Sequence, residues 1–298
     1  MTPTGPPAER VSPLFYAGMF LAASLSPLGS TMIAVALPAI GSELEIGGGQ
    51  LTQWLVSSYL IVGIAAMSPG GRLGDRIGHR RGLVLGMTIY GVGSVLGFTV
   101  ATLPALAFAR IAMAAGGAMT VPAVMALLRN LIPFERRPRA FGYFGSVMAT
   151  AAAIGPLLGG ELTARFGWRS VFIANIPVIV LAYWLIRITT QVEATDRNER
   201  ETPAFDVAGS GLLGAGLILL VVAAQASEGV TAAWAGAGGA VLLAIFVWWE
   251  RKVPEPVLDL RLFMERTFSS ASLVIGLQTL AMYSLLFQLP IFFDQVRG

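Results

Sequence analysis

One arginine stands inside a long apolar run, where a charged side chain is costly unless it is paired or hydrated. Arg110 lies early in the run 104–128. Ionisable residues inside a membrane span commonly mark a substrate or proton pathway. The alternative is that Arg110, about two turns into the helix, extends its head group to the membrane surface. We favour the first interpretation and expect Arg110 to act in transport or its coupling.

Other reactive side chains are scarce. The chain has no cysteine, which excludes disulfides and thiolate metal sites. His79 is the only histidine, which excludes a histidine metal cluster. No metal-ligand pair, nucleophile–base arrangement or phosphate loop occurs in or beside an apolar run. The sequence therefore predicts no enzyme, no metal and no cofactor. Nucleic acid is not an expected partner, because the basic residues lie in separated short segments.

The composition indicates a membrane protein. Of 298 residues, 55% are hydrophobic and only 12% are charged, whereas a soluble domain carries about 25% charge. A membrane-spanning helix needs about 20 mostly apolar residues. We therefore predict an all-α, polytopic membrane protein with about nine transmembrane helices. The predicted spans are 12–38, 51–70, 82–101, 104–128, 140–161, 168–187, 207–226, 233–249 and 268–292.

The basic residues predict the orientation of these spans. If the N-terminus is cytoplasmic, only Arg165, Arg169 and Arg297 fall outside, and Arg110 lies within a span. All other members of the 20 lysines and arginines fall on the cytoplasmic side. Short cytoplasmic loops are enriched in basic residues. We therefore expect a multi-pass protein of the cell (inner) membrane with its N-terminus inside.

The stretch 71–81, GRLGDRIGHRR, is predicted to be a short charged loop between two apolar runs. Its glycines allow two helix ends to approach, and Asp75 can cap a helix or pair with a basic neighbour. The alternative is a plain topology anchor. The pattern resembles the loop between helices 2 and 3 of major facilitator superfamily transporters, with His79 where Arg or Lys is usual. The resemblance implies a cytoplasmic gating role for Gly71, Gly74, Asp75, Arg76, Gly78 and Arg80.

Further motifs resemble the fourteen-helix drug:proton antiporter branch of that superfamily. The string Gly-Pro-x-x-Gly-Gly at 155–160 is similar to its antiporter motif, although glycine-rich membrane helices often serve only packing. The residues that fit this motif are Gly142, Gly155, Pro156, Gly159 and Gly160. The run 168–177, WRSVFIANIP, resembles the branch pattern Trp-Arg-x-x-Phe-x-x-Asn-x-Pro. Arg110 is similar to the helix-4 arginine of exporters, which the resemblance links to proton handling.

The sequence departs from the branch at the residue expected to carry protons. Gly29 occupies the position of the usual helix-1 aspartate, and residues 12–38 contain no carboxylate. Glu161 is then the best candidate for a proton carrier near a span. The alternative is that Glu161 ends a helix on the outside. Asp206 is predicted to be a helix N-cap on the cytoplasmic side.

The resemblance implies a division of the chain and a function. The expected segments are a cytoplasmic tail at 1–11, a six-helix bundle at 12–187, a cytoplasmic connector at 188–206, an inserted helix pair at 207–249, a cytoplasmic loop at 250–267 and the first helix of an incomplete C-terminal bundle at 268–298. The expected function is proton-coupled export of hydrophobic or cationic small molecules by alternating access, with substrate, protons and the lipid bilayer as partners. The alternative is a truncated, non-transporting remnant or an assembly partner.

Overall fold

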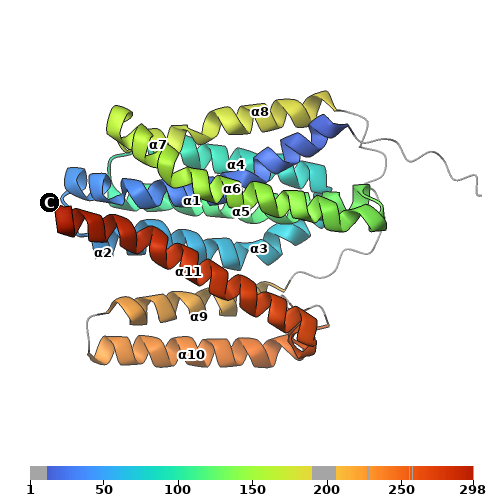
Figure 1. Ribbon diagram of the computed structural model, residues 1–298. Coiled ribbons are helices and arrows are strands. Elements are labelled where there is room, and N and C mark those ends of the chain that lie inside the picture. Colours follow the sequence, from blue (N-terminus) through green and yellow to red (C-terminus); the bar gives the residue numbers. More distant parts are fainter. Residues whose placement is uncertain (1–11, 190–205, 227–228, 255, 257, 298) are drawn as a thin grey trace, which may run out of the picture.

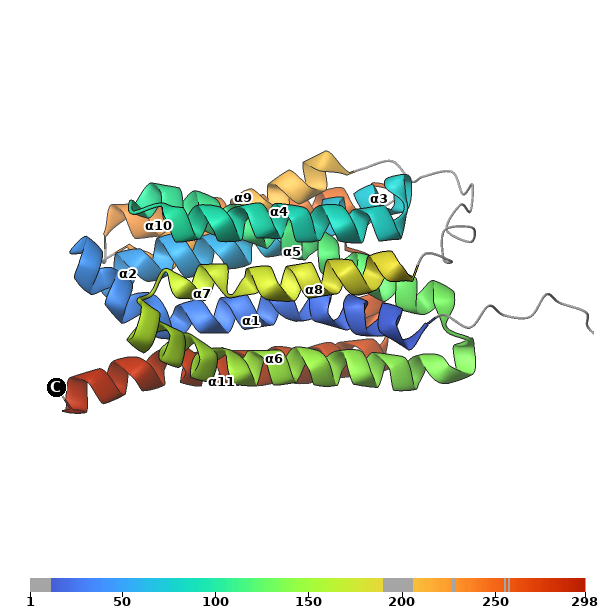
Figure 2. The same ribbon diagram turned by 90° about the horizontal axis from the view of Figure 1, so that it is seen from above.

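The computed structural model describes residues 12–189, 206–226, 229–254, 256 and 258–297, and in this part of the chain the regular secondary structure is entirely helical. Long helices run side by side and alternate in direction (Figures 1 and 2). The expected tail 1–11 and most of the expected connector 188–206 lie outside the described residues. The helices are α1 (Pro13–Leu44), α2 (Gly48–Leu51), α3 (Ser58–Ile77), α4 (His79–Thr99), α5 (Leu103–Leu131), α6 (Arg137–Phe166), α7 (Ser170–Ile173), α8 (Asn175–Ile188), α9 (Val207–Gln225), α10 (Val230–Glu250) and α11 (Arg266–Arg297). A π-helical segment, Thr52–Ser57, joins α2 to α3.

The prediction of an all-α, multi-pass membrane protein is confirmed. Among the described residues, eight helical stretches are long and apolar enough to cross a membrane. They match the first eight predicted spans in order. The ninth predicted span, 268–292, lies within α11, which is a long helix but is not among these eight.

Several helices extend beyond the apolar runs from which they were predicted. The first span was expected to end at Pro38, but α1 continues to Leu44 with Pro27 and Pro38 inside it. Proline is costly in a helix interior because it removes one backbone hydrogen bond, yet membrane helices tolerate it where neighbours satisfy the freed groups. At 1.5 Å per residue, the 32 residues of α1 span about 48 Å, which exceeds the roughly 30 Å hydrocarbon layer.

The core surrounds α1, which packs against α5, α6 and α8. Phe15, Met19, Ala36 and Ile40 of α1 are fully buried. Glycines bring the neighbouring helices close together. A Cβ on Gly86 of α4 would lie 2.8 Å from the Gly116 carbonyl oxygen of α5, so only glycine permits this approach.

The helices α9 and α10 pack against each other, and α9 also contacts α3. The prediction that Asp206 caps α9 is confirmed: its Oδ1 accepts from the Gly209 amide at 2.8 Å. The indole Nε1 of Trp249, at the end of α10, also donates to Asp206 at 3.0 Å. The buried Glu250 next to it accepts from the Leu258 amide at 2.9 Å. Two carboxylates therefore fix the start of α9 and the chain after α10.

The prediction of a loop at 71–81 is wrong. The helix α3 continues to Ile77, α4 starts at His79, and Gly78 alone makes the turn with a φ of 93°. Arg, Leu and Asp within this stretch are compatible with a helix, and glycine adopts positive φ at no steric cost. A Cβ on Gly82 of α4 would lie 3.0 Å from the Gly74 Cα of α3. The two helices therefore meet at backbone distance directly beside the turn.

We expect Gly78→Ala to destabilise the protein by about 1 kcal/mol or more, because a Cβ is strained at this positive φ. The measurement is the thermal unfolding midpoint of the purified protein in detergent. Gly48→Ala is the matched control, since nothing lies within 4 Å of a Cβ there and the residue is helical. Equal midpoints for both variants would contradict the assigned turn.

Candidate functional site

The candidate site is a buried polar cluster around Arg110 inside the bundle. Arg110 lies seven residues after the start of α5, about 10 Å along the helix, and is only 1% exposed. It therefore does not reach the surface, which rejects the snorkelling alternative in this structure. Its partners come from three other segments of the chain.

Backbone carbonyls and an aromatic ring hold the Arg110 guanidinium. Its Nε donates to the carbonyl oxygen of Leu55 at 3.0 Å, and its NH1 makes a longer contact of 3.5 Å with the carbonyl oxygen of Gly29. The guanidinium carbon lies 4.0 Å from the centre of the Tyr59 ring, a cation–π contact. Leu55 belongs to the π-helical segment, and such segments depart from regular backbone pairing and recur at functional sites.

Two tyrosine hydroxyls link the cluster to α1. The Tyr59 hydroxyl is hydrogen-bonded to the Ser26 hydroxyl at 2.9 Å. Tyr90 of α4 is fully buried and donates to the Leu25 carbonyl oxygen at 2.7 Å. The cluster therefore connects α1, α3, α4 and α5 through polar groups in an otherwise apolar core, where unpaired polar groups would be costly.

Residue 29 is a glycine, and side chains from other helices lie where its own side chain would be. A Cβ on Gly29 would overlap the Tyr90 hydroxyl oxygen and lie 3.5 Å from Oδ1 of Asn175. The Asn175 amide nitrogen donates to the carbonyls of Val171 and Phe172 at 3.2 and 3.0 Å. Its Oδ1 is buried and has no hydrogen-bond partner among the described residues. Tyr90 and Asn175 thus fill the space into which a residue-29 side chain would extend.

Glu161, unlike the buried residues around Arg110, lies on the surface. It is on α6, forms an ion pair with Arg165 one turn later, and its side chain is 58% exposed.

The motif glycines of α6 differ in how closely other parts of the protein approach them. A Cβ on Gly155 would overlap Thr31 of α1, and one on Gly159 would lie 2.8 Å from the Met32 carbonyl oxygen. By contrast, nothing lies within 4 Å of a Cβ on Gly142. Pro156 is inside the same helix.

The residues of the 71–81 stretch are distributed over two helix ends. Asp75 pairs with His79 at 3.7 Å. Gly71 lies beside Pro122 of α5, 3.5 Å from a Cβ built on it. Arg80 donates to the Ile186 carbonyl oxygen of α8 at 2.8 Å. Arg76 is exposed. This stretch therefore contacts α5 through Gly71 and α8 through Arg80.

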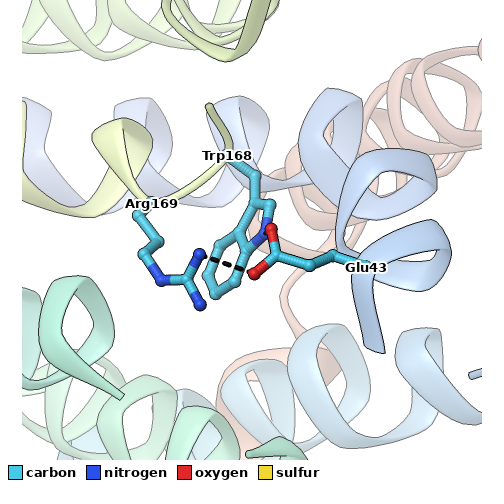
Figure 3. A network of polar contacts seen from close by, with 3 residues as sticks. All are labelled: Glu43, Trp168 and Arg169. Carbon is cyan, nitrogen blue, oxygen red and sulfur yellow. Dashed lines mark hydrogen bonds and ion pairs between the residues drawn. The ribbon is translucent and has the colours of Figure 1, made fainter. Parts of the chain in front are cut away.

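A second polar network was not anticipated from the sequence (Figure 3). The Glu43 carboxylate, near the end of α1, accepts from the Trp168 indole at 2.7 Å and from the Arg169 guanidinium at 2.7 Å. Arg169 also lies over the Trp168 ring, 4.3 Å from its centre. Trp168 is buried at 2% exposure and packs edge-on against Phe172. The Trp and Arg of the Trp-Arg-x-x-Phe pattern therefore anchor the α6–α7 connection to α1, and its Phe packs against the Trp.

The comparisons with known proteins decide the family. The model of the Major Facilitator Superfamily matches residues 19–298. The chain belongs to the Major Facilitator Superfamily. The human organic anion transporter MFSD10 (TETRAN), whose crystal structure is known, has a similar fold. That similarity has a TM-score of 0.54 at 14% sequence identity and covers 96% of this chain and 70% of that one.

Curated relatives are also similar in sequence over most of this chain. The methyl viologen resistance protein SmvA of Salmonella typhimurium is 32% identical over 82% of this chain and 49% of its own length. The riboflavin transporter RibZ of Clostridioides difficile is 28% identical over 92% of this chain and 59% of its own length. The chain thus spans about half the length of the curated relatives it matches. The family is one of membrane transporters and not of enzymes, and the eight candidate spans of the described residues agree with a multi-pass membrane protein.

We expect Gly29→Ala to lower the stability by about 1–3 kcal/mol, because the new methyl group overlaps the Tyr90 hydroxyl. Tyr90→Phe should restore part of this loss in the double variant, since the nearest ring carbon lies 3.4 Å from the new Cβ. The measurement is a double-mutant cycle of unfolding midpoints in detergent. Additive losses would contradict the packing of Tyr90 into position 29.

Proposed function

We propose that the protein takes part in proton-coupled export of hydrophobic or cationic small molecules across the cell membrane by alternating access. Because the chain spans about half the length of its relatives, this proposal concerns the complete product of its gene. We further propose that 12–187 form the first bundle, that 207–249 form an inserted helix pair, that 268–298 begin a second bundle, and that the N-terminus is cytoplasmic.

The observation that carries the proposal is the convergence of two motifs on α1. The Gly-Pro-x-x-Gly-Gly helix α6 packs on α1 at Gly155 and Gly159, with glycine allowing near-backbone contact. The Gly29 carbonyl of the same helix accepts from the buried Arg110. A displacement of α6 would therefore act on the helix that holds the arginine. This supports coupling between the antiporter-like motif and the buried charge.

The direction and the substrate class rest on similarity. SmvA is named for resistance to methyl viologen, a property expected of an exporter of a cationic compound, and it matches 82% of this chain. The resemblance of residues 155–160 to the antiporter motif favours the same direction. RibZ is named as a riboflavin transporter, so riboflavin belongs among the compounds tested.

In this proposal Arg110 controls coupling and Glu161 exchanges protons with the aqueous phase. The arginine is held by carbonyl oxygens, so its charge is kept in the core at a fixed position. Glu161 is the exposed acid of α6, on the helix that carries the antiporter-like motif. The stretch around Asp75 and Gly78 controls access at its own end of the bundle.

We expect Arg110→Lys to reduce proton-driven export about tenfold or more, because the compact ammonium cannot reproduce the guanidinium's fixed donor geometry. The complete gene product is expressed in bacteria, and everted vesicles are prepared and energised by a pH gradient. The rate at which they take up a cationic dye, methyl viologen or riboflavin from the medium is measured. Arg139→Lys is the matched control, since Arg139 is exposed. Wild-type rates for Arg110→Lys, or transport of all compounds unaffected by collapsing the gradient, would contradict the proposal.

We expect Glu161→Gln to weaken the dependence of transport on the pH gradient while leaving downhill substrate movement in place. A neutral amide cannot release a proton, but it keeps the size of the side chain. The measurement is proton uptake per substrate exported in reconstituted vesicles. Glu45→Gln, at another exposed glutamate, is the control. An unchanged proton-to-substrate ratio for Glu161→Gln would remove Glu161 from the coupling and leave it as half of a helix-end ion pair.

A further inference from the structure

A groove of about 620 Å³ lies on the outer surface of the bundle between the beginning of α4 and the end of α8. None of the residues that line the groove belongs to the Arg110 cluster. On α4 they lie on the face opposite Gly86, the glycine that packs on α5. The chain reverses at Gly78, so the first turn of α4 and the last turn of α8 lie at the same end of the bundle (Figure 2). The residues lining it are Arg80, Arg81, Val84, Leu85, Thr88, Tyr183, Ile186 and Arg187.

The end of the groove beside the first turn of α4 is strongly basic. Three of its lining residues are arginines, and none of them is acidic. Arg80 is fixed by its hydrogen bond to the Ile186 carbonyl oxygen at 2.8 Å. Arg187 donates to the Tyr183 hydroxyl at 3.2 Å. Arg81 and Arg187 are exposed, so a ligand outside the bundle can reach them. Such a set of planar donors suits the oxygens of a phosphate group.

The other end of the groove, further along α4, is mainly apolar. Val84, Leu85 and Thr88 follow Arg81 along α4, and Thr88 lies seven residues further, about 10 Å along the helix axis. Leu85 is 38% exposed. The apolar wall therefore begins next to the arginines and continues along α4 toward the middle of the helix. A free phosphate ion would use the arginines alone, whereas a lipid would use both parts.

We propose that this groove binds one anionic phospholipid, with the phosphate between Arg81, Arg187 and Tyr183 and an acyl chain along Val84 and Leu85. Basic pockets between membrane helices are known to hold anionic head groups. The charge of the lining residues and the change from basic to apolar along α4 carry the proposal. It does not depend on the direction or the substrate of transport.

The experiment measures lipid binding to the complete, purified gene product by native mass spectrometry. Phosphatidylglycerol, phosphatidylcholine and inorganic phosphate are the probes. We expect phosphatidylglycerol to bind at least about tenfold more tightly than phosphatidylcholine. The double variant Arg81→Gln/Arg187→Gln should lose about tenfold in phosphatidylglycerol affinity and little for phosphatidylcholine. Both side chains are exposed, so the fold should be retained, which the unfolding midpoint checks.

The matched control is Arg136→Gln/Arg139→Gln, which removes the same charge from two exposed positions at the start of α6. It should bind phosphatidylglycerol within about twofold of the wild type. Equal losses in both double variants would overturn the proposal, because binding would then follow overall charge. Complete competition by millimolar inorganic phosphate would also overturn it, since the groove would then be a small-anion site that does not use its apolar wall.

Discussion

The arrangement of the bundle depends on one buried charge that backbone oxygens hold. Arg110 can stay at 1% exposure because carbonyls of Leu55 and Gly29 accept from it and the Tyr59 ring faces it. A buried charge without such partners would be strongly unfavourable. The positions of α1, α5 and the π-helical segment are therefore mutually constrained. Any rearrangement that separates these segments must supply the guanidinium with other partners.

Close helix contact makes this arrangement possible. In lipid, helix association relies on packing and hydrogen bonds, because the surrounding chains are as apolar as leucine. Glycines at 86 and 116 bring α4 against α5, and glycines at 155 and 159 bring α6 against α1. Tyr90 can then reach across to α1 and fill the space at Gly29. Small residues thus place a large polar side chain where the resembling branch usually has an acid.

The sequence predicted the helical type and the order of eight spans correctly, because long apolar runs are a strong signal. The orientation inferred from the arginines remains a prediction. The sequence singled out Arg110, which the structure buries, but not the partners of Arg110, since two of them are backbone carbonyls that leave no trace in composition. A role of Arg110 in transport remains a prediction. The loop expected at 71–81 was wrong because charge was taken as a sign of irregular structure, although these residues continue a helix up to Gly78. Glu43 was not singled out, since its partners Trp168 and Arg169 lie more than 120 positions away. The roles of Glu161 and of the 71–81 residues in transport remain predictions.

The one-residue turn at Gly78 has a mechanical consequence. With no slack between Ile77 and His79, and with Gly74 against Gly82, α3 and α4 cannot slide past one another without unwinding a helical turn. We therefore expect α3 and α4 to move as one rigid unit, and α4 is also joined to α8 through the hydrogen bond of Arg80 to the Ile186 carbonyl. A conformational change should then displace this unit as a whole and leave the contact between its two helices unchanged.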